Sequence, residues 1–520
     1  MELVKKNIHM NKLKCKSSLQ LNLHDDINVP DSKPDIASIM KISGEVRIDE
    51  QKILSGKFYL RGSLNFQLLY LSAEDDYQIH NMTGKLNIDE ALHLDEECNV
   101  ENAVLRWDLE DLTANVINSR KLSIRSLLQL HLTAGEIYDE NACIAINSDT
   151  PVCIRKETIH VTGLAACKKD SYRLRNELTL PQNKGSIREL LYHSANLKNV
   201  DIRLLQDQFN IKGEVLVFLL YSSEDGDAAA EYYETELPFH AVIDCNGCDE
   251  SMTPDITLAI TDNTFEVRSD SDGESRVISL DALIEMQIKI YEENTLDVIQ
   301  DLYSPSLALT PIYRPVTYEN LLVRNTNKVR ISEHTRIPDT APKILQICHG
   351  SGNIHVDEVL LTEDGLLVEG VIEADIFYIT SEDSRPMYAV KTMLPFEQLI
   401  EIMNLTADSV YSITPELEQL TVLSSESDEL EIKASILLNS LVFNRITSNF
   451  LSGVTEEPLD YNMLFALPGM TGYIVRENDT LWEIAKAHHT TMESIMDLNE
   501  LSTDAPPVGT RLLLLKEVGA

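Results

Sequence analysis

Residues 62–70 read GSLNFQLLY, and the same pattern returns twice further along the chain. The second copy is GEVLVFLLY at residues 213–221, and the third is GVIEADIFY at residues 370–378, so the copies lie 151 and 157 residues apart. Each copy begins with glycine and ends with tyrosine. The chain therefore contains a repeat of about 150 residues in three copies.

Apolar side chains alternate along each copy of this stretch. One face of the first copy carries Leu64, Phe66, Leu68 and Tyr70. A period of two with β-branched and aromatic residues predicts a strand that buries this face. We therefore expect the closing tyrosines to be core residues, with their hydroxyls at the rim of the core rather than in a binding surface. They are Tyr70, Tyr221 and Tyr378.

Two further landmarks recur around the glycine strand. A proline precedes it at the same offsets, as Pro30, Pro181 and Pro338. A second alternating segment near the end of each copy has a small residue at its middle, which is Ser126, Ala282 or Ala434. We also expect short helices just after the prolines, for example at residues 34–40 and 187–192. Three landmarks in one order, three times over, show that the repeat is not a coincidence.

The repeat predicts both the fold class and the domains. Short alternating segments separated by polar turns are typical of sandwiches and barrels, so the protein should be mainly β, with three repeated β-sandwich-like modules. The period is longer than that of common solenoids, so each copy is expected to fold as a domain. The modules are placed at residues 1–150, 151–305 and 306–452.

A different pattern follows a linker that we place at residues 453–471, where prolines and glycines interrupt the chain. The pattern at residues 472–517 predicts a small βααβ domain. Asp479 or Thr480 is expected to cap its first helix. The expected elements are a strand at residues 473–475, this first helix, a second helix that Thr491 opens and Asn499 ends, and a strand at residues 511–515.

This C-terminal segment resembles the LysM family. The matching residues are Tyr473, Val475, Asp479, Thr480, Leu481, Trp482, Ile484, Ala485, Leu498, Asn499 and Gly509. Asn478 replaces the usual glycine, although asparagine also tolerates the left-handed conformation, and Val508 stands where proline is common. The resemblance implies a shallow groove that binds N-acetylglucosamine polymers. In this sequence the groove would consist of Asn478, Asp479, Thr480 and Leu481 facing Leu501, Ser502 and Thr503.

The three upstream modules resemble the SPOCS domain family of spore-forming clostridia. Three such modules before one LysM domain imply a non-enzymatic scaffold or adaptor in spore-coat assembly. The resemblance further implies a mother-cell cytoplasmic protein at the forespore surface, with a coat ATPase of the SpoIVA type as partner. The alternative is a cell-wall protein that binds peptidoglycan or cortex glycan, in which the modules only present the LysM domain.

Composition agrees with the adaptor hypothesis and argues against a nucleic-acid-binding, exported or membrane-spanning protein. The chain has 520 residues and a net charge of −40, a field that repels nucleic acid and anionic lipid. The N-terminus MELVKKNIHM lacks the apolar core of a signal peptide, so we expect no export, and no apolar run is long enough to span a bilayer. The eight cysteines have no disulfide-framework spacing and are expected to be reduced in a cytoplasmic compartment.

No catalytic, metal or cofactor site emerges from the sequence. Cys245 and Cys248 form the one C-x-x-C motif, which lacks the further ligands of a structural zinc site and is interpreted as a plain loop. Acidic pairs follow each repeated strand, but two carboxylates are too few for a calcium loop, so they are interpreted as hairpin turns. They are Glu74-Asp75, Glu224-Asp225 and Glu382-Asp383. We therefore expect neither enzymatic activity nor a cofactor.

Overall fold

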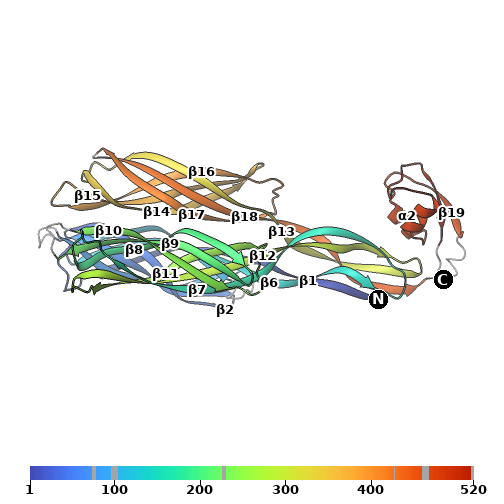
Figure 1. Ribbon diagram of the computed structural model, residues 1–520, viewed down its shortest axis with the longest axis horizontal. Helices are drawn as coiled ribbons and strands as arrows, with labels where there is room; N and C mark the ends of the chain where they lie inside the picture. Colours follow the sequence, from blue (N-terminus) through green and yellow to red (C-terminus); the bar gives the residue numbers. More distant parts are fainter. Residues whose placement is uncertain (73–77, 95–102, 225–229, 427, 460–467, 517–520) are drawn as a thin grey trace.

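The computed structural model describes residues 1–72, 78–94, 103–224, 230–426, 428–459 and 468–516. The protein is mainly β, and each copy of the repeat forms one six-stranded module (Figure 1). The first module contains β1 (Glu2–Asn28), β2 (Ser38–Leu54), β3 (Lys57–Leu71), β4 (Ile79–His93), β5 (Ala103–Asn118) and β6 (Lys121–Asn147). The second contains β7 (Cys153–Thr179), β8 (Ile187–Leu205), β9 (Gln208–Ser223), β10 (Glu231–Asp244), β11 (Thr253–Ser269) and β12 (Ser275–Tyr303). The third contains β13 (Leu307–Arg336), β14 (Ile344–Leu361), β15 (Gly365–Thr380), β16 (Met387–Glu401), β17 (Val410–Glu426) and β18 (Glu429–Pro458).

Each module is a sandwich of two three-stranded antiparallel sheets. In the first module β3 lies between β2 and β4, while β6 lies between β1 and β5, and the other modules repeat this order. Apolar side chains of β3 and β6, such as Phe58, Leu60, Leu128 and Leu130, share one core between the two sheets. The predicted fold class is confirmed.

The repeated glycine strand is the centre of each sandwich. It forms β3, β9 and β15, and its closing tyrosines, Tyr70, Tyr221 and Tyr378, are fully buried. A Cβ atom on Gly62 would lie 2.2 Å from the carbonyl oxygen of Arg47, because a β-bulge in β2 brings that backbone close. Gly370 has the same relation to the carbonyl oxygen of His355, at 2.3 Å. Close approach of a neighbouring backbone therefore explains the glycine of the first and third copies. At Gly213 an added Cβ atom would instead meet the Phe239 ring, at 2.8 Å.

The expected helices after the prolines are wrong. Each proline is instead the first residue of a tight turn. Its carbonyl oxygen accepts a hydrogen bond from the backbone N–H three residues later, at 2.8–3.0 Å. Strands β2 and β8 begin where the helices were expected and pair with the glycine strands. The buried tyrosines fix two of these turns, because Tyr70 and Tyr378 donate hydrogen bonds to the carbonyls of Pro34 and Pro342. Long-range strand pairing thus outweighs local helix preference here.

The acidic turns are described only in part. Glu74, Asp75 and Asp225 lie outside the described residues. In the third module the Glu382 carboxylate accepts hydrogen bonds from the Arg385 guanidinium, at 2.8 and 3.0 Å, and so helps to close the turn between β15 and β16.

The modules share an apolar core in a stalk made of the outer halves of their six longest strands (Figure 1). Each module contributes buried residues to it, and those of the first strands recur at the same 151- and 157-residue offsets as the repeated glycines. From the first strands these are Ile8, Ile159 and Val316, followed by Met10, Val161 and Tyr318. From the returning strands they are Ala142, Val298 and Phe450. The stalk therefore has an approximate threefold arrangement within one chain.

A second shared core lies between the sandwiches. It also takes equivalent residues from every module, namely Met40, Leu191 and Cys348, with Leu69, Leu220 and Phe377. Polar contacts at this junction differ from pair to pair. Lys41 of the first module forms an ion pair with Asp375 of the third, while His349 of the third stacks on Phe218 of the second, with ring centroids 4.1 Å apart. The three copies thus pack as one body, whereas the sequence predicts separately folded domains.

The C-terminal domain follows with β19 (Met470–Ile474), α2 (Leu481–Ala487), α3 (Met492–Leu498) and β20 (Arg511–Leu515), which confirms the βααβ order. Because β18 continues to Pro458 and β19 begins at Met470, strand occupies both ends of the expected linker at residues 453–471. Neither helix of the described residues is long and apolar enough to cross a membrane.

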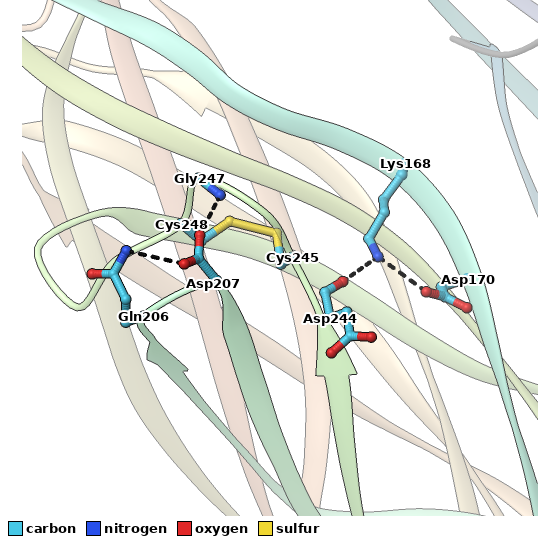
Figure 2. The surroundings of a disulfide bond; sticks show 8 residues. All are labelled: Lys168, Asp170, Gln206, Asp207, Asp244, Cys245, Gly247 and Cys248. Carbon is cyan, nitrogen blue, oxygen red and sulfur yellow. Dashed lines mark hydrogen bonds and ion pairs between the residues drawn. A yellow bond between two sulfur atoms is a disulfide. The ribbon is translucent and has the colours of Figure 1, made fainter.

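The cysteine expectation is wrong for one pair. Cys245 and Cys248 form a disulfide in the loop between β10 and β11 (Figure 2). A tight turn places their Cα atoms 5.9 Å apart, within the range a disulfide can bridge. The carboxylate of Asp207 accepts the Gly247 N–H at 2.8 Å and holds the loop against the β8–β9 hairpin. Five other cysteines of the described residues form no disulfide: Cys15, Cys143, Cys153, Cys167 and Cys348. Cys98 lies outside the described residues.

Replacing Tyr221 with aspartate should unfold or strongly destabilise the protein. The substitution places an unpaired charge in a fully buried position, which costs on the order of several kcal/mol. Tyr221→Phe is the matched control, since it removes only the hydroxyl bonded to Glu231 and should cost about 1 kcal/mol. Thermal melts by circular dichroism measure both. An unchanged melt for the aspartate variant would mean that Tyr221 is exposed.

Candidate functional site

The two helices of the C-terminal domain begin at capped ends. The Thr480 hydroxyl accepts the backbone N–H of Glu483 at 3.2 Å, and the Thr491 hydroxyl accepts that of Ser494 at 3.1 Å. These caps satisfy backbone donors that a helix leaves unpaired at its start. Leu481, Ile484 and Ile495 are buried between the helices and the two-stranded sheet.

Hydrogen bonds fix the loop before α2. Asn478 has a φ of +70°, the left-handed conformation that asparagine tolerates. The carboxylate of Asp479 accepts the Arg476 N–H at 2.8 Å and the Tyr473 hydroxyl at 2.7 Å. These two donors hold the pKa of Asp479 below its ordinary value of 3.8. Its stabilising effect on the loop is therefore complete above that value and is lost as the pH falls through the lower pKa of the folded protein.

The second loop follows α3. The Leu501 N–H donates to the carbonyl of Met496 at 2.9 Å, which closes the helix end. Ser502 and Thr503 come next, and both are exposed. The Thr503 hydroxyl accepts the N–H of Ala505 at 3.3 Å, so this loop is also braced by its own side chains.

The predicted groove residues differ in their availability to a ligand. Asn478, Thr480, Ser502 and Thr503 are exposed, and Asp479 and Leu501 are half-buried. Leu481 is 1% exposed and belongs to the domain core, against which Leu501 also packs. Leu481 and Leu501 thus belong to the domain core, and the exposed residues of the two loops are the polar ones. Helical spacing explains the Leu481 position, since Leu481, Ile484 and Ala485 stand at i, i+3 and i+4 and share the buried face of α2.

A larger hollow of about 2400 Å³ lies between the three modules. Carboxylates of different modules line it, and burial raises the pKa of Glu45, Glu319 and Glu416. Burial also lowers the pKa of His193 to about 4. Glu45 accepts a hydrogen bond from Asn263 of the second module, at 3.2 Å, and Glu319 pairs with Arg445 at 3.1 Å. The first contact links the first and second modules, and the second links β13 to β18. In the described part of the chain, no three histidine, cysteine or carboxylate side chains are grouped so that they could bind a metal ion.

Family comparisons identify the parts of the chain. The family described as "SipL, SPOCS domain" matches residues 35–117, 186–268 and 343–423, and the LysM domain family matches residues 473–514. Each SPOCS match spans four strands of a module, such as β2 to β5, and leaves the two long stalk strands outside. Both families are non-catalytic binding domains. Among the curated proteins and the solved structures, none matches this chain.

Replacing Thr480 with alanine should destabilise the LysM domain by about 1 kcal/mol, because α2 loses its cap. Ser502→Ala is the matched control: this residue is exposed on the other loop, and its substitution should change stability by less than about 0.5 kcal/mol. Thermal unfolding of the LysM domain compares the two. Equal stability of both variants would show that the Thr480 hydroxyl does not cap the helix.

Proposed function

Since the chain is a SipL-like protein, with three SPOCS domains and a C-terminal LysM domain, we propose that it is a non-enzymatic adaptor in spore-coat assembly. This architecture is the observation that carries the proposal. The modules at residues 1–150, 151–305 and 306–452 supply the body of the adaptor, and the LysM domain supplies a binding module. The chain acts in the mother-cell cytoplasm, at the forespore surface.

The shape of the molecule supports an adaptor. The sandwiches occupy one end, and the LysM domain and the N-terminus lie at the stalk end (Figure 1). Shared apolar cores in the stalk and between the sandwiches hold these two ends apart as one body. A body of this kind can contact one partner through its sandwiches while its LysM domain contacts another.

The proposed protein partner is a coat ATPase of the SpoIVA type. Charge supports a protein partner with basic surfaces, because the chain carries −40 and residues 472–516 hold seven acidic against four basic side chains, a net charge of −3. The negative charge has little effect on the binding of a neutral glycan. Binding to a basic protein partner should therefore weaken as salt is added.

LysM domains bind peptidoglycan and related glycans, so a glycan ligand is the second candidate. The exposed polar residues Asn478, Thr480, Ser502 and Thr503 surround the two LysM loops and could serve either ligand. In the glycan alternative the three modules only present the LysM domain to the cortex or wall. The two functions differ in what the LysM domain contributes to localisation.

Deletion of residues 468–520 should abolish both forespore localisation and copurification of the coat ATPase from sporulating cells. The intact chain should bind purified peptidoglycan weakly, and its binding to the coat ATPase should decline between low and high salt. Fluorescence microscopy and pull-downs measure these effects, with Tyr221→Phe, which leaves the LysM loops unchanged, as a folded control. Tight, salt-insensitive binding to peptidoglycan together with normal localisation of the deletion variant would overturn the adaptor in favour of the glycan binder.

A further inference from the structure

The three long hairpins have the same irregularity near the stalk end. Each contains a β-bulge at the equivalent place, with Ile144, Gln300 or Ser452 as the extra residue. The residues just after the bulge are Ala145, Asp301 and Gly453, which pair with Val4, Arg155 and Ile312. Two positions further on stand Asn147, Tyr303 and Thr455. The backbones are thus equivalent, but the side chains at these positions differ.

The LysM domain contacts the second of these hairpins through polar groups. The Asp301 carboxylate accepts the indole N–H of Trp482 at 2.8 Å and the Lys486 ammonium at 2.7 Å. The Tyr303 hydroxyl donates to the carbonyl of Thr490 at 3.0 Å. Burial acts to raise the pKa of Asp301, but the hydrogen bonds from Lys486 and Trp482 outweigh it and hold the pKa below its ordinary value. Asp301 therefore stays ionised and paired at neutral pH.

Apolar and aromatic packing surrounds this contact. The rings of Tyr303 and Trp482 meet edge to face, with centroids 4.8 Å apart, and only 5% and 7% of these residues are exposed. The guanidinium of Arg155 lies 5.5 Å from the centre of the indole, and Cys153 packs against the LysM core. The contact has the buried aromatic centre of a specific interface.

At the equivalent positions the first and third hairpins lack these groups. Alanine, valine and asparagine on the first, and glycine, isoleucine and threonine on the third, offer neither a carboxylate nor an aromatic ring to Trp482 and Lys486. Docking on either would leave the Lys486 ammonium without its anion. The three hairpins have similar backbones, and the side chains of the second one make it the binding site of the LysM domain.

The docked surface and the LysM loops are different parts of the domain. Trp482 and Lys486 lie within α2, whereas the exposed loop residues Asn478 and Thr480 precede this helix. Ser502 and Thr503 are also exposed while the domain is docked. Ligand binding at the loops is therefore compatible with docking.

We propose that the stalk hairpin of the second module, formed by β7 and β12, is the receptor for the LysM domain of this same chain, and that the LysM domain acts while docked there. Asp301 is the positioning residue. It fixes α2, and with it the loop that precedes this helix, in one orientation at the end of the stalk. The LysM domain is then a fixed part of the body rather than a domain that moves freely on its connection, whichever ligand its loops bind.

Two probes, one on each side of the contact, test this in the full-length chain. The chain has two tryptophans, so Trp107→Phe leaves Trp482 as the only one. In that background, Asp301→Ala and Lys486→Gln should each shift Trp482 emission to the red and increase its quenching by acrylamide. They should also speed the reaction of the Cys153 thiol with a maleimide, measured by mass spectrometry of its peptide. Asp297→Ala is the matched control, since this exposed carboxylate on the same strand bonds to Thr158 and does not touch the LysM domain.

The two variants separate undocking from unfolding. Asp301→Ala alters the module and Lys486→Gln alters the LysM domain, so a fold defect in one partner cannot produce both results, and circular dichroism melts identify such a defect. The proposal is supported if both variants, and not Asp297→Ala, expose Trp482 and Cys153 with the fold retained. It is overturned if Trp482 quenching and Cys153 reactivity stay at the parental level in both variants. Because no ligand is used, this outcome is independent of the proposed coat-assembly function.

Discussion

Burial of the apolar stripe along the long hairpins is the constraint on which the structure depends. A two-stranded hairpin cannot bury such a stripe by itself, and the sandwiches end before the stalk begins. The stripes of all three modules meet instead, and each supplies equivalent residues such as Ile8, Ile159 and Val316. This shared burial explains why the repeat occurs three times in one chain and why its copies are arranged around a common axis.

Polar residues break the approximate threefold symmetry, because they make contacts that differ from one module to the next. Lys41 pairs with Asp375 between the first and third modules, and Asp301 of the second module alone receives the LysM domain. A symmetric body would offer three equal sites at the end of the stalk. The side chains that differ among the hairpins leave one such site, at Asp301, where Trp482 and Lys486 of the LysM domain bind.

The sequence predicts the local features well, because they depend on short patterns. The alternation ending in Tyr70, Tyr221 and Tyr378 predicts the buried central strands. The expected caps, Asp479 or Thr480 and then Thr491, predict both LysM helices, and Thr480 is the cap of the first. Features set by contacts between distant residues are missed. The residues after the proline turns form strands because β3 and β9 lie beside them. The core of the stalk requires all three hairpins. The Cys245–Cys248 disulfide depends on a turn held by Asp207. The LysM resemblance implies a groove position for Leu481, whereas the structure buries its side chain in the domain core.

Hydrogen exchange in a stalk variant tests most directly whether the three modules form one body. Val161→Asp places a charge in the shared stalk core, where Val161 is 1% exposed and clusters with Met10 and Tyr318 of the other modules. If the stalk is a single core, exchange should accelerate in β1 and β13 as well as in β7, because all three strands lose the same packing. Faster exchange confined to β7 and β12, with β1 and β13 still protected, would contradict the account.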